Sequence, residues 1–104
     1  MKYEKNYYTY IMASAKNGTL YIGVTSNLAD RIDKHKQGMY DGFTKKYKVD
    51  KLVYYEIYGD VYEAITKEKQ LKKWNREWKI KLIEKNNPGW KDLYDDLFKD
   101  DDQN

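Results

Sequence analysis

The chain has 104 residues, of which 40% are hydrophobic and 36% charged, a composition that fits one globular domain with a modest core. It contains no cysteine and a single histidine, which excludes a disulfide framework, a thiolate zinc site and a His-rich metal site. No apolar run approaches the roughly 20 residues of a membrane span, and the N-terminus lacks the apolar stretch of a secretory signal. We therefore expect a cytoplasmic protein.

The net charge of +3 is unevenly distributed along the chain. Residues 95–104 contain five aspartates and one lysine, a local charge of −4, which leaves +7 on residues 1–94. We expect a single domain over residues 1–94 and a solvated, disordered acidic tail over residues 95–104. A basic body with 12 tyrosines and 3 tryptophans is compatible with a phosphate-bearing partner, although many cytoplasmic domains carry a similar surplus.

Two strand-like runs open the chain, at residues 7–14 and 19–24. They flank the sequence AKNG, in which Asn17 and Gly18 are typical of a two-residue hairpin turn. If these two residues form the turn, Ala13 pairs with Ile22 across the hairpin.

The later elements are predicted from caps, breakers and β-branched runs. They are a helix from TSN (25–27) to Gly38, a basic loop over 38–50, a strand over 52–59, a long helix after Asp60 that breaks or bends near Trp74 to Arg76, and a short helical piece over 91–98. The predicted order is ββαβαα, and the predicted fold class is α+β: a small three-stranded antiparallel sheet flanked by helices.

The hairpin has two unlike faces, because side chains alternate along a strand. One face carries aliphatic residues and predicts a core: Ile11, Ala13, Leu20, Ile22 and Val24. The other face carries Tyr8, Tyr10, Met12, Tyr21 and Gly23, and the glycine leaves the backbone open to close approach. The tyrosines either pack under a helix with bonded hydroxyls or form the floor of a site.

The helix after TSN places two polar residues on its inward side. At about 100° per residue, Arg31 and His35 fall on the same arc as Leu28 and Ile32. A single polar residue there often extends along the flank of the helix to reach water. Two of them, at positions i and i+4, suggest an anion site, since burying a guanidinium costs several kcal/mol unless an anion meets it.

Glu68 falls within the apolar stripe of the long helix, beside Ala64, Ile65 and Leu71. A carboxylate in that position should be paired, protonated or bound to a metal. A buried Glu68–Arg31 ion pair is one interpretation. The other is a single oxygen ligand to Mg²⁺, which commonly keeps several waters and uses one or two carboxylates together with substrate phosphate.

These residues give the chain a resemblance to the GIY-YIG nuclease superfamily, specifically to its small stand-alone bacterial branch and to the nuclease domain of the excision-repair nuclease C subunit. The matching segments, within residues 5–94, are YTYIM (8–12), LYIGV (20–24), the helix with Arg31 and His35, and EAITKEKQLKKW (63–74). One departure is Tyr8, which stands where the first motif opens with glycine and which could narrow the groove.

The resemblance implies a divalent-metal-dependent endonuclease that hydrolyses phosphodiester bonds in DNA. Tyr10 would be the general base, Tyr21 would line the site with Gly23 supporting it, Arg31 would stabilise the phosphate, and His35 would assist proton transfer. Glu68 would bind one Mg²⁺ or Mn²⁺ ion. Asn87, or less favourably Asn86, would be the family's late asparagine. The tyrosine face would then be a catalytic floor rather than a closed core.

Substrate contacts would come from basic residues that bind phosphates without reading sequence: Lys45, Lys46, Lys48, Lys69, Lys72, Lys73 and Arg76. Trp74, Trp78 and Trp90 either pack in the core or stack on a base. Two alternatives stay open, a nucleic-acid-binding module without turnover and a structural or partner-binding protein. The choice of DNA over RNA, the structure that is cut and a partner protein for targeting are also open.

Overall fold

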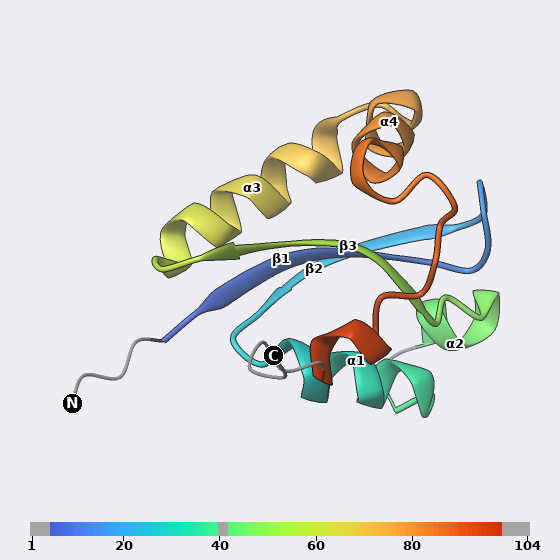
Figure 1. Ribbon diagram of the computed structural model, residues 1–104, viewed down its shortest axis with the longest axis horizontal. Coiled ribbons are helices and arrows are strands. Elements are labelled where there is room, and N and C mark those ends of the chain that lie inside the picture. Colours follow the sequence, from blue (N-terminus) through green and yellow to red (C-terminus); the bar gives the residue numbers. More distant parts are fainter. Residues whose placement is uncertain (1–4, 40–41, 99–104) are drawn as a thin grey trace, which may run out of the picture.

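The computed structural model describes residues 5–39 and 42–98. Its centre is a three-stranded antiparallel sheet in the order β2-β1-β3. Helices α3 and α4 cover one face of the sheet, while α1 and the C-terminal 3-10 helix η1 lie on the other (Figure 1). The elements are β1 (Tyr7–Ala13), β2 (Leu20–Thr25), α1 (Leu28–Lys36), α2 (Gly42–Tyr47), β3 (Lys51–Tyr58), α3 (Val61–Lys73), α4 (Arg76–Asn86) and η1 (Asp95–Phe98).

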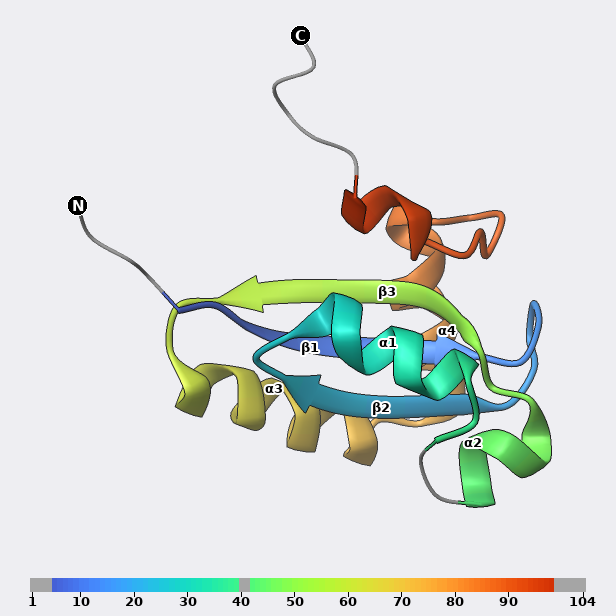
Figure 2. The same cartoon turned by 90° about the horizontal axis from the view of Figure 1, so that it is seen from below.

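The predicted fold class is confirmed, and the structure has a helix at a place where the sequence indicated a loop. Residues 42–47, expected to be loop, form the short helix α2, which lies beside the end of the sheet where β3 begins (Figure 2). This helix buries only Thr44, and Val49 beyond it is also buried. So few buried residues leave no helical periodicity to detect.

The β1–β2 register differs from the prediction by two residues. Ala13 faces Leu20 and Tyr10 faces Gly23, because the loop spans residues 14–19 rather than two residues. Ser14 closes this loop: its backbone N–H donates to Thr19 O (3.0 Å), and its Oγ accepts from Thr19 N (2.9 Å). A shift of two preserves the side-chain alternation, so the predicted division into two faces is unchanged.

The helix ends follow the predicted caps. Asn27 and Asp60 cap α1 and α3, their side chains accepting from the backbone N–H of Asp30 and Tyr62. Gly38 follows α1 with a φ of 70°, a left-handed conformation that favours glycine. The expected break in the long helix is confirmed, because Trp74 is extended and Asn75 caps a separate helix, α4.

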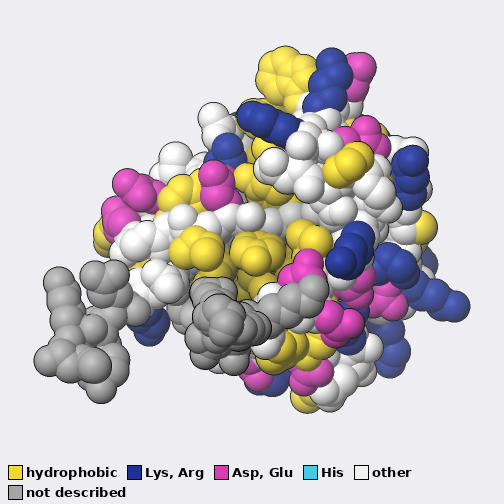
Figure 3. Space-filling model, in the orientation of Figure 1, with side chains coloured by type: hydrophobic (Ala, Val, Ile, Leu, Met, Phe, Trp, Pro, Cys, Tyr) yellow, Lys and Arg dark blue, Asp and Glu magenta, His cyan; other side chains and the backbone are white. Residues whose placement is uncertain are grey.

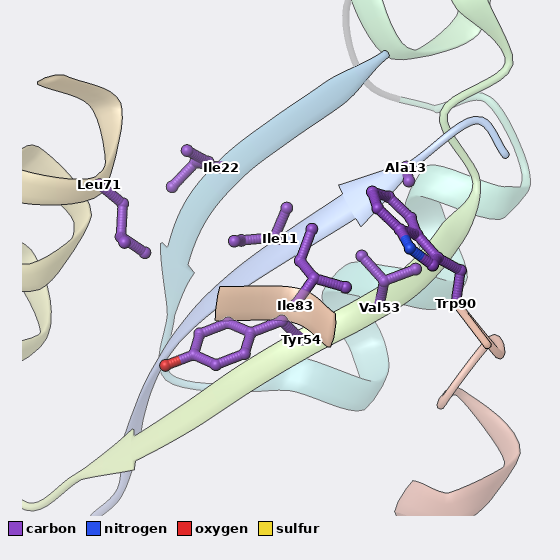
Figure 4. Packing of buried hydrophobic residues seen from close by; sticks show 8 residues of the cluster. All are labelled: Ile11, Ala13, Ile22, Val53, Tyr54, Leu71, Ile83 and Trp90. Carbon is purple, nitrogen blue, oxygen red and sulfur yellow. The ribbon is translucent and has the colours of Figure 1, made fainter. Parts of the chain in front are cut away.

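The aliphatic face of the sheet packs against α3 and α4. Figure 4 shows this cluster, in which Leu71 of α3 and Ile83 of α4 close over Ile11 and Ile22 of the hairpin. Trp90 completes it and is only 4% exposed, which confirms a core role for this tryptophan. Among the described helices, none combines the length and the apolar character needed to cross a membrane.

The tyrosine face is a second core, which corrects the expectation of an open floor. Tyr10 and Met12 are fully buried under Leu28 and Ile32 of α1. Tyr8 makes an edge contact with Tyr55 of β3, with ring centroids 6.4 Å apart, and so contacts the strand on the far side of β1 from β2.

The chain reaches this second core by passing around β3. Asp92 accepts from the backbone N–H of Leu52 (3.1 Å) and pairs with Lys36 of α1. Beyond it, Leu97 of η1 packs against the same core, so the disorder expected from residue 95 does not hold for residues 95–98. Residues 99–104 of the predicted tail lie outside the described residues.

Candidate active site

Tyr10 and His35 meet beneath α1. The Tyr10 hydroxyl lies 3.2 Å from His35 Nε2, and the two side chains are 0% and 5% exposed. The central strand β1 fixes the phenol, and the burial of Leu28, Ile32 and His35 along one side of α1 fixes the imidazole. The predicted inward position of His35 is therefore correct, while the burial of Tyr10 separates it from solvent.

Gly23 is required by the position of Tyr10. A Cβ atom at residue 23 would lie 2.5 Å from the Tyr10 hydroxyl oxygen and 2.6 Å from its Cζ atom. These distances are far inside van der Waals contact, and the ring is buried, so it could withdraw only by disturbing the core around it. The glycine of the YIG sequence thus creates the space in which the Tyr10 phenol approaches His35.

Tyr21 is the tyrosine at the open side of the cluster. Its ring centroid is 5.2 Å from that of His35, 6.4 Å from that of Tyr10 and 6.3 Å from that of Phe43. It is half-buried and lines a hollow of about 320 Å³ with Leu20, Ile22, Phe43, Lys72 and Lys79.

This hollow curves around the edge of the sheet. Tyr21 belongs to the core under α1, whereas Leu20 and Ile22 on either side of it belong to the core under α3 and α4. Because β2 is an edge strand, side chains from both faces reach the same space. Residues on α1 and on α3, which lie on opposite sides of the sheet (Figure 1), can therefore serve one site.

Arg31 and Glu68 belong to helices on opposite faces of the sheet, α1 and α3, and neither lines the Tyr21 hollow. Arg31 is half-buried, one helical turn before His35. Glu68 is 16% exposed and pairs with Lys72 (2.8 Å), and among the described residues no salt bridge joins it to Arg31. The buried Glu68–Arg31 pair, one of the two interpretations of the sequence, is therefore wrong. Glu68 is next to the Tyr21 hollow only through its salt bridge, because its partner Lys72 lines that hollow.

The protein side chains near Glu68 suit a divalent cation only if most of the ligands of the ion are waters and substrate oxygens. Within residues 5–39 and 42–98, no cluster of three or more His, Asp or Glu side chains is present. Glu68 would thus be the single protein carboxylate, a set that suits Mg²⁺ with waters and substrate phosphate. The cation would have to displace the ammonium of Lys72, whose side chain is 54% exposed and able to move away.

Asn87 is not brought to the Tyr21 hollow. Its amide donates to Val53 O (3.0 Å) and Lys91 O (2.9 Å) and accepts from Lys91 N (3.0 Å). Val53 lies on β3, and β3 and β2 are the opposite edges of the sheet. The side chain is 8% exposed and joins the end of α4 to β3, whereas its neighbour Asn86 is exposed.

The predicted basic residues fall into separate groups. Lys72 lines the Tyr21 hollow, and Lys45 and Lys48 line a smaller one, about 180 Å³, with His35 and Thr44. Lys46 lies over the Tyr47 ring, 5.4 Å from its centroid, and Lys69 and Lys73 are exposed on α3.

Arg76 and Lys79 change the predicted basic surface. Arg76 donates to Asn17 O and Gly18 O (both 2.6 Å) and so binds the hairpin loop to α4. Lys79 lines the Tyr21 hollow and was missed by sequence reasoning. The one feature of the sequence that could have indicated Lys79 is its spacing, seven residues after Lys72. A helix break lies between the two lysines, and the sequence does not give the angle of that break.

A second polar cluster lies on β3. Glu56 Oε1 accepts from the hydroxyls of Tyr54 (2.8 Å) and Tyr58 (2.7 Å). Burial opposes ionisation of Glu56, but these hydrogen bonds and the charge of Lys67 outweigh it and lower the pKa of the carboxyl. Burial, followed by the Glu56 carboxylate, raises the pKa of both phenols. The cluster is thus a stable, ionised hydrogen-bonded unit on another strand than Tyr21.

The sheet, the Tyr-His-Tyr cluster and the edge hollow together define a GIY-YIG catalytic domain. Residues 6–81 match the model of this domain, and the chain belongs to the GIY-YIG family. It is similar to the UPF0213 proteins of Pediococcus pentosaceus (36% identity, 77% of this chain and 83% of the relative) and Staphylococcus saprophyticus (36%, 74% and 93%).

A solved structure supports the same assignment. The solution NMR structure of the UPF0213 protein BH0048 from Bacillus halodurans matches 85% of this chain and 93% of its own at 27% identity, with a TM-score of 0.53. The resemblance to the small bacterial GIY-YIG branch is therefore confirmed.

Proposed function

We propose that this protein is a divalent-metal-dependent endonuclease that hydrolyses phosphodiester bonds in DNA. The observation that carries the proposal is the Tyr10–His35–Tyr21 cluster beside a hollow that also holds Lys72 and Lys79. An acid–base cluster that is open at Tyr21 and lies beside two cations suits a phosphodiester, which needs proton transfer and charge stabilisation together.

The burial of Tyr10 changes the roles of the two tyrosines. We assign Tyr21 to the substrate side, since its ring lines the hollow, and Tyr10 to holding His35 through the hydroxyl–Nε2 hydrogen bond. His35 then has a fixed orientation at 5.2 Å, centroid to centroid, from the Tyr21 ring. Through its Nε2 the imidazole can take or return the proton of the Tyr10 phenol, which lies within hydrogen-bond distance.

Charge stabilisation comes from residues on both sides of the sheet. Arg31 offers planar donors suited to phosphoryl oxygens, and Lys72 and Lys79 place positive charge in the hollow. Glu68 is the residue that would hold a Mg²⁺ or Mn²⁺ ion. When bound, such an ion supplies Lewis-acid polarisation of the phosphate and of the leaving oxygen.

The test is cleavage of supercoiled plasmid and of end-labelled duplex, branched and single-stranded DNA, with matched RNA, in Mg²⁺, Mn²⁺ or EDTA. Wild type should cut in a metal-dependent way, and Arg31→Ala and Tyr21→Phe should lose at least a hundredfold in rate. Tyr62→Phe, an exposed tyrosine on α3, is the matched control and should cut normally. If the protein binds these substrates but cleaves none of them, it is a nucleic-acid-binding module and the nuclease proposal is wrong.

A further inference from the structure

The outer side of α4 carries an aromatic groove outside the Tyr21 hollow. Trp78, Lys81, Leu82 and Lys85 recur at i, i+3, i+4 and i+7 and so share one side of the helix. Trp74, which follows α3, borders the groove, a shallow and open depression of about 310 Å³. The two indoles meet edge to face, with centroids 5.8 Å apart and planes at 87°.

The core does not require Trp78 at this position. Ile80 and Ile83 are the α4 residues that face the aliphatic core together with Leu82, whereas Trp78 is 54% exposed. An indole left in water forfeits the burial that gives tryptophan most of its stabilising effect. The Trp74 ring behind it fixes one edge of the indole and leaves the rest of its surface accessible.

The rim of the groove is cationic. Lys81 and Lys85 border it, and within the described part of the chain neither forms a salt bridge. Of the two acids on α4, Glu84 accepts from Trp90 Nε1 (2.7 Å), and Glu77, the residue before Trp78, is exposed and forms no salt bridge within the described residues. In Figure 3, hydrophobic, Lys or Arg, and Asp or Glu side chains stand together at the top of the molecule, where Figure 1 places α4.

The groove and the Tyr21 hollow have no lining residue in common, but both draw residues from α4. Lys79 lines the hollow and Trp78, the residue before it, lines the groove, on sides of the helix about 100° apart. A separate hollow beside Tyr62 of α3 is bordered by the acidic Glu63 and is lined by no tryptophan.

From this arrangement we propose that the α4 groove binds an unpaired nucleobase, which stacks on Trp78 while Lys81 and Lys85 contact the flanking phosphates. The proposal rests on the proposed nuclease function, for which it names single-stranded nucleic acid, or a duplex with an unpaired stretch, as the preferred substrate. Base stacking on an aromatic side chain is sequence-tolerant and contributes about 1–3 kcal/mol per base. Bases within a continuous duplex already stack on both faces and cannot enter.

A second copy of this chain fits the groove less well. A symmetric contact would place the Lys81–Lys85 rim against its own equivalent, so that like charges face each other. A stable interface also needs about 800 Å² per partner, far more than one indole and one leucine supply. A nucleic acid strand complements the groove in two ways: its phosphates match the cationic rim, and its flat bases match the exposed indole.

The test separates binding from cleavage by working in EDTA. A labelled dT12 strand and a 12-base-pair duplex are titrated with wild type, Trp78→Ala, Trp78→Phe and the control Tyr62→Ala, which removes a side chain 74% exposed on α3. Binding is followed by anisotropy and by quenching of tryptophan emission. Thermal melts confirm that each variant is folded.

Trp78→Ala should weaken binding of dT12 about 5- to 150-fold, which corresponds to the loss of about 1–3 kcal/mol of stacking. Its duplex binding should stay within twofold of wild type, Trp78→Phe should recover most of the loss, and Tyr62→Ala should change neither. Equal weakening of strand and duplex, or no change for the strand, overturns the proposal. So does a wild-type dimer, seen by sedimentation, that Trp78→Ala dissociates.

The two proposals fail in different ways. Loss of strand binding in Trp78→Ala without any metal-dependent cleavage by wild type would keep the groove and reject the nuclease. Cleavage that Trp78→Ala leaves unchanged on single-stranded and duplex substrates alike would keep the nuclease and reject the groove.

Discussion

A Cβ atom on residue 23 would lie 2.5 Å from the hydroxyl oxygen of Tyr10, the residue that faces Gly23 across the β1–β2 pair. Gly23→Ala must therefore push the buried phenol away from His35. Overpacking of this kind costs about 1–3 kcal/mol, and the Tyr10–His35 hydrogen bond should be lost. Urea denaturation measures the first effect. NMR of the single imidazole measures the second, because no other histidine overlaps it.

The control for this change is Gly59→Ala, where an added Cβ would meet no heavy atom within 4 Å. It should alter stability by less than about 0.5 kcal/mol and leave the imidazole resonances in place. Equal losses in the two variants would show that the cost comes from backbone freedom rather than from the Tyr10 contact.

Asn87→Ala should destabilise the fold strongly, because the amide satisfies Val53 O, Lys91 O and Lys91 N in a buried position. Leaving such groups unpaired costs about 1–3 kcal/mol each when they stay dry, so we expect a total loss of about 2–4 kcal/mol. Asn86→Ala is the matched control, since Asn86 is exposed at the end of the same helix. Denaturation midpoints of the two variants compare them directly. A catalytic asparagine would instead show normal stability and lost cleavage.

Much of this fold could be predicted from residue spacing. The alternation of Ile11, Tyr10 and Met12 separates two faces whatever the register, and the caps at Asn27 and Asp60 fix helix starts locally. The register itself could not be predicted, because it depends on the side chain of Ser14 closing a longer loop.

The site was harder to predict, for a geometric reason. A helical projection gives the angle of Glu68 around its own axis but not the face of the sheet on which the helix packs. The helices that carry Arg31 and Glu68, α1 and α3, lie on opposite faces of the sheet (Figure 1), so the ion pair inferred from the two inward positions is wrong. Tyr21 and Lys79 meet only because β2 is an edge strand, which is a property of the assembled sheet.

Thr44→Val should stabilise the protein. The Thr44 hydroxyl is buried, at 3% exposure, and has no hydrogen-bond partner among the described residues. A methyl group of similar shape removes a desolvated polar atom and should raise the free energy of unfolding by about 1 kcal/mol. Thr66→Val on α3 replaces an exposed threonine and should have little effect. A lower denaturation midpoint for Thr44→Val would mean that a bound water satisfies the hydroxyl in solution.

Asp92→Asn should reduce stability at neutral pH and lose this effect in acid. Burial opposes ionisation of Asp92, but Lys36 and the backbone N–H groups of Tyr94 and Leu52 outweigh it and lower its pKa. A lowered folded-state pKa gives stability that is fully present above the unfolded value, about 4, and is lost as pH falls through the folded value. Asparagine keeps an acceptor but loses the charge.

We expect a difference on the order of 1 kcal/mol at pH 7, because the Lys36–Asp92 pair is about one-third exposed and partly screened. The difference between wild type and Asp92→Asn should shrink steadily as the pH falls below about 4 in urea titrations. Asp30→Asn, which removes a more exposed pair with Lys34, should give a smaller effect. If the stability difference between wild type and Asp92→Asn instead grows as the pH falls, the pKa of Asp92 is not lowered in the folded protein and the assigned cause is wrong.

Glu68→Ala should abolish cleavage at a stability cost below about 1 kcal/mol. Its partner Lys72 is 54% exposed and regains water when the carboxylate is removed, so no charge is left buried. Glu63→Ala, also on α3, should retain both activity and stability. A loss of several kcal/mol in Glu68→Ala would instead indicate that the carboxylate neutralises a buried cation.

Lys72→Met gives the sharper test of the metal site, because the Lys72 ammonium is paired with the Glu68 carboxylate, to which the cation must bind. Removing this competing charge should tighten Mn²⁺ binding several-fold, as measured without substrate by the broadening of NMR signals near Glu68. The same variant should bind DNA more weakly, since it removes a cation from the Tyr21 hollow. Lys69→Met, on an exposed part of α3, should leave Mn²⁺ binding unchanged. If Mn²⁺ broadens the same signals equally in Lys72→Met, Lys69→Met and Glu68→Ala, Glu68 is not the ligand.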